Sequence, residues 1–262
     1  MQLTAVFEEN RAHLLAVARR ILGNVHDAED AVQQAWLKAA GADLSAVANP
    51  PGWLTTVVSR ECLDMLRQRR CEHVLDDEIV VWDSDVTDLD EVSTAMSVLM
   101  ELLSPAQRVA FVLHDLFGMP FTAVAAALGT TPAAARQLAS RARRAVRGAA
   151  APRGDRVLAE AFLTASRDGD IPTLLHVLAP DVVRRVDALL VPPGVPTEVR
   201  GARAVAEETR AFAVRARAGV VVEFGGAPVI ALMSGGRARI VIRLTFGAGR
   251  ITVVDIRPTS AE

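Results

Sequence analysis

The chain has 262 residues, about half of them apolar, and a net charge of -2, which is enough for two or three small domains, each with its own core. No apolar run reaches the roughly 18 to 20 residues that cross a bilayer, and the first residues lack the order of a signal peptide. The two cysteines, Cys62 and Cys71, have neither a zinc nor a disulfide spacing, and the five histidines form no metal motif. These features exclude a membrane protein and a disulfide scaffold. They favour a cytoplasmic protein that needs no metal and no cofactor.

The first 71 residues are expected to form three helices. Apolar residues at helical spacing predict a helix over 3–22, which Gly23-Asn24 ends. A second helix is predicted over 27–40, with acidic residues in its first turn, where they complement the helix dipole. Residues 41–52 read as a loop because they are rich in Gly, Asp, Asn and Pro. A third helix, 53–70, ends in the basic run "LRQRR".

An acidic linker is predicted over 72–95. Nine acidic residues and no Lys or Arg lie between Glu72 and Glu91, and basic clusters lie on either side. Segregated basic patches in a nearly neutral chain are typical of a nucleic-acid-binding protein.

A second helical module is predicted over 96–150. Ser104-Pro105 starts a helix that runs to Phe117, and Gly118 to Pro120 break it. A short helix follows over 121–129, and Thr131 caps the next one, 132–147. Two short helices joined by a tight turn that contains glycine are the pattern of a helix-turn-helix.

Five arginines and no acid occupy residues 136–147. On a helix, Ala135, Leu138, Ala139, Ala142 and Val146 form the buried stripe, so the other face carries small residues, glutamine and arginine. Such a face suits the major groove, where Gln and Arg read base edges and flanking Arg neutralise phosphates. The candidates for base contact are Thr131, Ala133, Arg136, Gln137 and Ser140, and those for phosphate contact are Arg141, Arg143 and Arg144. A solvated basic face is the alternative, although solvated faces normally mix signs.

The remaining residues, 155–260, are predicted to fold as an α+β domain. Three helices are expected at 155–168, 170–178 and about 200–217. Glycine-rich turns separate strands in a mostly antiparallel meander. The predicted strands are 181–190, 219–224, 227–233, 237–246 and 250–257.

Three stretches resemble parts of sigma-70-family factors of the compact extracytoplasmic-function (ECF) group. "DAEDAVQQAWLKA" (27–39) and "NPPGWL" with "LDMLRQRR" resemble region 2, and "LSPAQRVAFVLHDLFGMPFTAVAAALGTTPAAARQLASRARRAVR" is similar to region 4. The resemblance covers about 1–71 and 97–148. It implies an all-α pair of sigma regions that binds RNA polymerase core and directs initiation at promoters with −35 and −10 elements.

The resemblance also implies where the partners bind. Region 2 would bind the β′ clamp helices of the polymerase through Asp27, Glu29, Asp30, Gln33, Gln34 and Trp36, and the β flap would be a second polymerase contact. The −10 element would meet the loop at Asp43, Ser45 and Asn49, and the helix at Arg60, Arg67, Arg69 and Arg70. Trp53 is expected in the core. Arg60-Glu61 departs from the family pattern, in which an Arg-Asn pair stands one place earlier.

Residues 155–258 resemble SnoaL-like domains, which are α+β cones around a pocket, on "AEAFLTASRDGDIPTLLHVLAPDVV" (159–183). Asp187 stands where the related sigma factors begin an Asp-Gly-Gly-Gly motif, but the glycines are lost. Candidate pocket residues are Arg185, Asp187, Arg243 and Asp255. Because the chain has no tyrosine and no suitably spaced histidine, we expect no catalysis. We expect instead a domain that contacts the sigma regions and tunes their activity.

Two other functions remain open at this point. One is an ordinary helix-turn-helix regulator with a ligand-binding C-terminal domain. The other is a SnoaL-like enzyme with an accessory helical region. Residues 1–71 favour the sigma factor, since a simple regulator does not need them.

Overall fold

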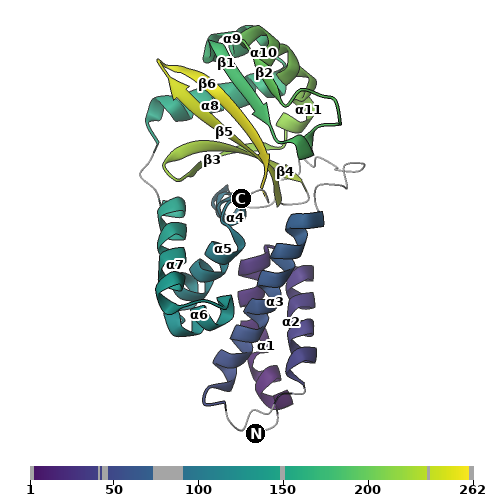
Figure 1. Ribbon diagram of the computed structural model, residues 1–262, viewed down its shortest axis with the longest axis vertical. Coiled ribbons are helices and arrows are strands. Elements are labelled where there is room, and N and C mark those ends of the chain that lie inside the picture. Colours follow the sequence, from purple (N-terminus) through teal and green to yellow (C-terminus); the bar gives the residue numbers. More distant parts are fainter. Residues whose placement is uncertain are drawn as a thin grey trace. The chain divides into compact units, whose positions relative to one another are not determined.

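A computed structural model describes residues 3–40, 42, 47–72, 91–147, 151–234 and 237–259. The chain divides into two compact units: unit 1 comprises residues 1–71 and 103–144, and unit 2 comprises residues 72–102 and 145–262. The expected order is confirmed, with helical modules first and an α+β domain after them (Figure 1).

The N-terminal module of unit 1 consists of α1 (Leu3–Leu22), α2 (Val25–Ala39) and α3 (Pro50–Glu72). Its core contains Leu14, Ile21 and Leu54, which are fully buried. Gly23, with φ of 85°, follows the last residue of α1, at the predicted Gly23-Asn24 stop. Asn24 caps the second helix, because its Oδ1 accepts a hydrogen bond from the Asp27 amide at 2.8 Å. This cap starts α2 two residues before the predicted position.

The helix-turn-helix module of unit 1 is built from α5 (Pro105–Phe111), the π-helical turn η2 (Val112–Leu116), α6 (Phe121–Leu128) and α7 (Pro132–Arg147). Ser104 and Gln107 form a reciprocal capping box at the start of α5. The predicted helix to Phe117 is present, but its second half is wound as a π-helix. Gly118 and Gly129, with φ near +65°, provide the left-handed residues that end η2 and α6.

Unit 2 contains one six-stranded sheet in the order β2-β1-β6-β5-β4-β3. β1 and β6 pair in parallel, and the other neighbours pair antiparallel. The strands are β1 (Leu178–Val186), β2 (Glu198–Arg200), β3 (Gly219–Phe224), β4 (Ala227–Ser234), β5 (Arg237–Gly247) and β6 (Arg250–Pro258). The prediction missed β2, which is only three residues long, and it extended β1 into residues 188–190, which form a 3-10 turn, η3 (Ala188–Leu190).

Helices cover both faces of this sheet. On one face lie α8 (Arg153–Asp168), α9 (Ile171–Val177), α10 (Ala202–Ala211) and α11 (Ala213–Ala216) (Figure 1). They bury an apolar core that includes Phe162, Leu174 and Ile230. The single helix predicted over 200–217 is interrupted at Phe212.

The opposite face of the sheet is covered in part by α4 (Glu91–Glu101). Val98 and Leu102 pack there against residues of β3, β4 and β5. The predicted linker, 72–95, therefore contains the start of a helix, while its residues 73–90 lie outside the described part of the chain. Packing thus places α4 in unit 2, whereas residues 103–144 of the predicted module 96–150 belong to unit 1.

Candidate nucleic-acid and polymerase interfaces

Helix α7 presents the basic face that its sequence predicts. Ala135, Ala139 and Ala142 are buried, and Leu138 and Val146 are half-buried along the same stripe. The other face is exposed at Ala133, Arg136, Gln137, Arg141, Arg144 and Arg147. Thr131 caps the helix, since its Oγ1 accepts a hydrogen bond from the Ala134 amide at 3.2 Å. The candidates for base contact therefore lie at the exposed N-terminal end of α7, with Ser140 half-buried behind them.

Two arginines of α7 also have partners inside the helix-turn-helix. Arg143 is ion-paired to Asp115 of η2 at 3.2 Å, and the Asp115 side chain is only 12% exposed. The Arg136 guanidinium lies over the Phe121 ring, 5.2 Å from its centroid. These contacts orient α7 on the preceding helices. Arg143, predicted as a phosphate contact, thus has a structural partner as well.

The start of α3 carries the described part of the predicted −10 surface. Asn49 caps the helix, because its Oδ1 accepts from the Gly52 amide at 3.1 Å. A Cβ at position 52 would lie 2.6 Å from Asn49 Nδ2, so a larger residue there would displace the Asn49 side chain from its cap. Asp43 and Ser45 lie outside the described residues, as do the side chains of Arg69 and Arg70.

Arg60 and Arg67 are both exposed on α3 but have different neighbours. Arg60 donates from Nε and Nη2 to the Ala126 carbonyl of α6, at 3.1 and 2.7 Å. Arg67 is near Asp64 of its own helix, at 3.6 Å. The Arg60 guanidinium is therefore hydrogen-bonded to the helix-turn-helix, whereas the Arg67 guanidinium contacts only its own helix among the interactions described.

The departure at Arg60-Glu61 has a structural explanation. Glu61 points between helices and accepts from Lys38 Nζ at 2.7 and 2.8 Å. Its side chain is 12% exposed, while that of Lys38 is 59% exposed. Glu61 thus ties α3 to α2.

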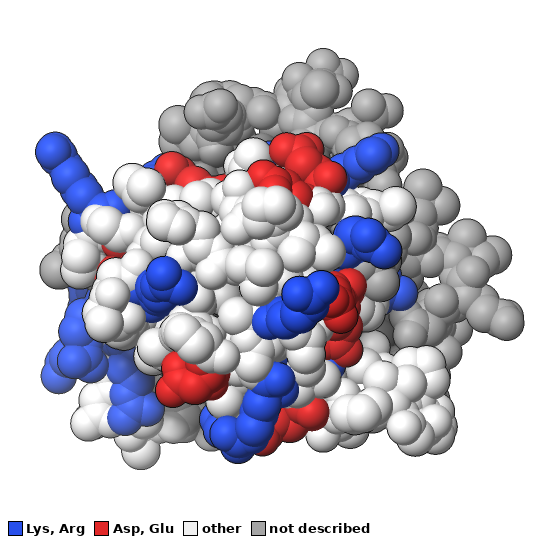
Figure 2. Space-filling view, turned by 90° about the horizontal axis from the view of Figure 1, so that it is seen from above, with Lys and Arg blue, Asp and Glu red and all other residues white. Residues whose placement is uncertain are grey.

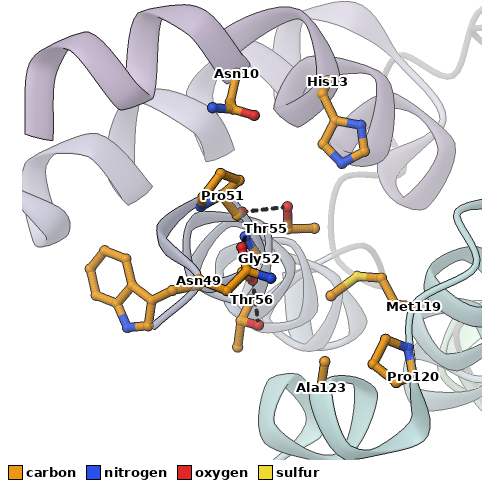
Figure 3. Close-up of a pocket in the computed structure, with 11 residues that line it drawn as sticks. Asn10, His13, Asn49, Pro51, Gly52, Thr55, Thr56, Met119, Pro120 and Ala123 are labelled. Carbon is orange, nitrogen blue, oxygen red and sulfur yellow. Dashed lines mark hydrogen bonds between the residues drawn. The ribbon is translucent and has the colours of Figure 1, made fainter. Parts of the chain in front are cut away.

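A cavity of about 480 Å³ lies beside this cap, within unit 1 (Figure 3). Asn10 and His13 of α1 face it from one side, the start of α3 from another, and Met119, Pro120 and Ala123 from the helix-turn-helix. Trp53 lines the cavity and is half-buried. Trp53, which the sequence predicts in the core, therefore lies at the edge of the core.

The outer face of α2 carries most of the predicted polymerase contacts. Glu29, Asp30, Gln33 and Gln34 are exposed. Leu37, on the same helix, is also exposed, with 58% of its surface accessible. Leu37 was missed because its spacing alone does not separate it from core leucines.

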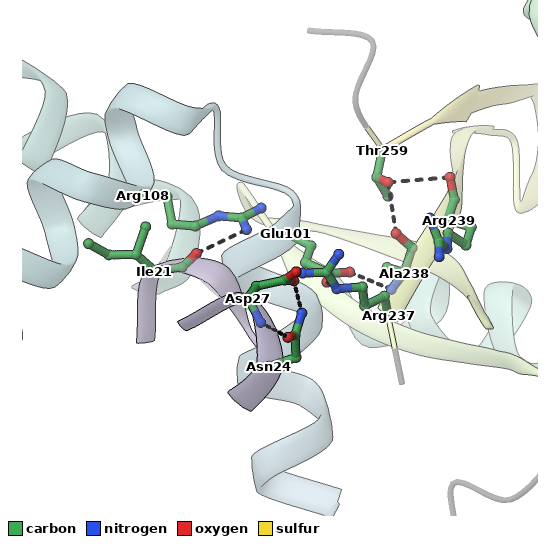
Figure 4. A network of polar contacts seen from close by, with 9 residues as sticks. All are labelled: Ile21, Asn24, Asp27, Glu101, Arg108, Arg237, Ala238, Arg239 and Thr259. Carbon is green, nitrogen blue, oxygen red and sulfur yellow. Dashed lines mark hydrogen bonds and ion pairs between the residues drawn. The ribbon is translucent and has the colours of Figure 1, made fainter. Parts of the chain in front are cut away.

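The other two predicted polymerase contacts are partly used inside the module. Asp27 exchanges hydrogen bonds with Asn24 (Figure 4). Trp36 is half-buried against Phe7, with ring centroids 4.7 Å apart.

Three of the four candidate pocket residues of the C-terminal domain share one face of the sheet. Arg185, Asp255 and Arg243 are register neighbours on β1, β6 and β5. Their sequence neighbours Leu244 and Val254 belong to the core beneath the helices, so the three charged side chains lie on the opposite face. Asp187 caps η3 by accepting from the Leu189 amide at 3.0 Å.

Ion pairs also mix the signs of charge elsewhere on this domain. Arg184 pairs with Glu208, and Arg203 pairs with Glu207 at 3.0 Å. On the face seen in Figure 2, basic and acidic side chains lie side by side over the central part. The exposed face of α7 differs from this surface, because it carries arginines and no acidic residue.

Two helical modules with exposed arginines, one of them a helix-turn-helix, define a DNA-binding protein of the transcription apparatus. Residues 6–71 match Sigma-70 region 2, and residues 93–146 match Sigma-70, region 4. The chain belongs to the ECF RNA polymerase sigma factors. It is thus a sigma factor that directs transcription initiation, and an α+β domain follows its sigma regions.

Two curated relatives are from Mycobacterium tuberculosis. "ECF RNA polymerase sigma factor SigJ" is 41% identical over 252 residues, which cover 87% of this chain and 78% of the relative. "Probable ECF RNA polymerase sigma factor SigI" is 35% identical over 203 residues, covering 71% and 70%. The crystal structure of M. tuberculosis SigJ aligns over 98% of this chain and 97% of that one, with 32% identity and a TM-score of 0.43. Sigma factors are not a family of enzymes. Within the described ranges, no helix has the length and apolar character to cross a membrane.

Proposed function

We propose that α7 reads the −35 element and that α3 with its preceding loop reads the −10 element. The observation that carries this proposal is the exposed face of α7, where arginines and a glutamine stand without acidic neighbours along the helix. In a helix-turn-helix, the first residues of the second helix face the bases. We assign base contact to Thr131, Ala133, Arg136, Gln137 and Ser140, and phosphate contact to Arg141, Arg143 and Arg144. On the −10 element we assign the roles to Asn49, Arg60, Arg67 and the residues predicted with them.

The outer face of α2 is proposed to bind the β′ clamp helices of core polymerase. An exposed leucine three to eight residues after the exposed Glu29, Asp30, Gln33 and Gln34 offers the mixture of apolar and polar side chains that protein-binding surfaces use. Leu37 supplies the apolar part, so it joins the predicted residues. We further propose that the β flap contacts region 4, that the protein works in the cytoplasm, and that it catalyses no reaction itself.

Run-off transcription with purified core polymerase tests the assignment to α7. The chain should support transcription from promoters with its −35 and −10 elements. Replacing Arg136 and Gln137 by Ala should reduce discrimination between −35 sequences by roughly 1–3 kcal/mol for each lost base contact. Arg144→Ala is the matched control on the same helix, because loss of a phosphate contact weakens binding to all promoters alike. Unchanged selectivity in the double variant would show that another face of α7 meets the bases.

The C-terminal domain is proposed to tune sigma activity through its attachment to region 4. The support is the packing of α4 on its sheet. Deleting 153–262 should change transcription or the affinity for core polymerase. The deleted chain should also carry Val98→Ser and Leu102→Ser, so that the uncovered α4 does not aggregate. If neither transcription nor affinity changes, tuning by this domain is ruled out.

A further inference from the structure

Arg136 is a candidate base-reading residue whose partner in the helix-turn-helix is an aromatic ring. Its guanidinium lies over Phe121, the first residue of α6, with Cζ 5.2 Å from the ring centroid. A cation within about 6 Å of the face of an aromatic ring is attracted by the quadrupole of the ring. Within the described residues no ion pair involves Arg136, whereas Arg143 of the same helix is paired with Asp115. The first helix of the helix-turn-helix therefore holds Arg136 through a ring face and not through a carboxylate.

This kind of contact leaves the hydrogen-bonding groups of Arg136 available. A guanidinium has five N–H donors, and a bidentate pair with a carboxylate takes two of them. A ring face attracts the cation as a whole and occupies none of its in-plane donors. Arg136 is exposed at the N-terminal end of α7, the part of a helix-turn-helix that meets base edges. The protein can thus hold Arg136 while the side chain donates two hydrogen bonds to one base.

The Phe121 ring is itself held by His114 of η2. The two rings are stacked, with centroids 3.8 Å apart and planes inclined by 29°. His114 Nδ1 lies 2.9 Å from the Met119 carbonyl oxygen, and because a carbonyl only accepts, Nδ1 carries the hydrogen and donates it. Both rings are half-buried. The ring that attracts Arg136 therefore has a support of its own.

The turn between η2 and α6 fixes the positions of both rings. Met119 is bonded through both its main-chain groups, since its amide donates to the Leu113 carbonyl at 2.9 Å and its carbonyl accepts from His114. Only Pro120 separates Met119 from Phe121, and proline has a fixed φ. The winding of η2 as a π-helix is frequent at functional sites. A closely bonded turn thus presents the two rings.

Holding Arg136 in place lowers the cost of recognition. A free arginine loses rotamer freedom when it binds a base, and a held arginine has lost part of this freedom beforehand. The gain applies only to the base that Arg136 contacts, so it raises discrimination at that position and not the general affinity for DNA. A cation–π contact at an exposed site shifts an equilibrium by about two- to fivefold.

We infer that Phe121 is a positioning residue for recognition of the −35 element. Its ring holds the Arg136 guanidinium in place for the base, so Phe121 acts through Arg136. This inference rests on the proposed reading of the −35 element by α7, and it names the residue that makes Arg136 selective. A residue that served packing alone would affect all base positions equally.

The test uses holoenzyme made from the full chain and core polymerase, on a promoter library randomised over the −35 and −10 elements. Sequencing of the transcripts gives the base preference at each position. Arg136→Ala should lose the preference at one −35 position. Phe121→Leu should reduce the preference at that same position by about two- to fivefold and leave the other positions unchanged. Phe121→Tyr should retain it, because the aromatic face remains.

A double variant and a spectroscopic signal separate positioning from packing. In the Arg136→Ala background, Phe121→Leu should have no further effect at this position, because the two residues act as one unit. In the unmodified chain, NMR should find the side-chain protons of Arg136 shifted upfield by the ring, and Phe121→Leu should abolish this shift. Val124→Ala is the matched control for folding. Val124 is fully buried in the same helix, so its truncation weakens α6 while the Phe121 ring remains.

Three results would overturn the inference. If Arg136→Ala loses a −35 preference and Phe121→Leu does not reduce it, α7 reads the element as proposed but Phe121 does not position Arg136. If Phe121→Leu and Val124→Ala change the preferences alike, Phe121 serves packing alone. If Arg136→Ala changes no −35 preference, the proposed reading by Arg136 fails and the inference fails with it.

Discussion

Lys38 and Glu61 lie 23 positions apart in the sequence, yet they form one of the contacts that hold region 2 together. Both carboxylate oxygens of Glu61 accept from one ammonium group, and Glu61 is almost enclosed. Lys38 is more than half exposed, so solvent weakens the attraction. The value of the pair therefore lies mainly in keeping a nearly buried carboxylate partnered.

Replacing Lys38 by Met should destabilise region 2 by about 1–3 kcal/mol, because it leaves the Glu61 carboxylate without its cation. Urea unfolding measures this difference. The double variant Lys38→Met, Glu61→Gln should recover part of the loss, since it removes the buried charge as well. Equal stability of Lys38→Met and the unmodified chain would mean that Glu61 is solvated in solution.

Glu198 on β2 shows how the charged face of the C-terminal sheet is organised. Hydrogen bonds from Arg185 and then Arg200 lower the pKa of Glu198 below its ordinary value. A lowered pKa in the folded state adds stability above the ordinary glutamate pKa, and this stability is lost as the pH falls through the lowered value. Arg185, a candidate pocket residue, thus serves the edge of the sheet.

An NMR titration should find the Glu198 midpoint below that of an ordinary glutamate. Arg185→Ala should raise it, because the larger of the two lowering interactions is removed. Arg203→Ala, which breaks the separate pair with Glu207, should leave the Glu198 midpoint unchanged. If the Glu198 midpoint is the same in Arg185→Ala as in the unmodified chain, the side chains of Arg185 and Glu198 are apart in solution.

At the scale of the element, α7 carries one arginine that is ion-paired within the helix-turn-helix and others that are exposed. Arg143 is held by Asp115, whereas Arg141 and Arg144 are exposed along the same helix. Exposed arginines that meet phosphates release counterions from DNA, so binding weakens as salt rises. The position of each arginine on α7 therefore predicts how it contributes to salt dependence.

Arg141→Ala and Arg144→Ala should each reduce the slope of log K against log salt by about 0.9 for a −35 duplex, with little change in sequence preference. Fluorescence anisotropy over a salt series measures the slope. Arg143→Ala serves as the comparison, and it should also lower the stability of the helix-turn-helix because Asp115 loses its partner. A slope that stays the same in Arg141→Ala and Arg144→Ala would place the phosphates elsewhere.

At the scale of the whole molecule, contacts between distant parts of the chain decide which DNA-reading groups are available. In unit 1, Arg60 of region 2 donates to the Ala126 carbonyl of α6. Arg108 of α5, which is 8% exposed, donates to the Ile21 carbonyl of α1 at 3.3 Å (Figure 4). Arg60 and Arg108 thus join the two modules. Arg60 is also a predicted −10 contact.

Arg60→Ala should loosen the packing of region 2 on the helix-turn-helix, because two hydrogen bonds to Ala126 are lost. Energy transfer between dyes on α1 and α6 should fall in this variant. Arg67→Ala is the control, since Arg67 contacts only Asp64 of its own helix among the interactions described. Equal transfer in both variants would show that Arg60 does not hold the modules together.

Local sequence signals predicted the helical elements well because their causes are local. The caps at Asn24, Ser104 and Thr131, and the glycines at 118 and 129, end or start helices through contacts within a few residues. The amphipathic stripe of α7 likewise depends only on helical spacing. The π-helical turn and the short β2 were missed, since each depends on neighbours far along the chain.

The sequence by itself determined the order of the modules, the buried stripe of α7 and the alternating strands β3 to β6, because periodicity and turn chemistry specify them. Only the tertiary structure decided that α4 packs on the C-terminal sheet, that Glu61 pairs with Lys38, and that Arg185, Arg243 and Asp255 share an outer face of that sheet. The physical reason is that an amphipathic helix or a charged side chain specifies that it needs a partner, while the partner is chosen by long-range packing.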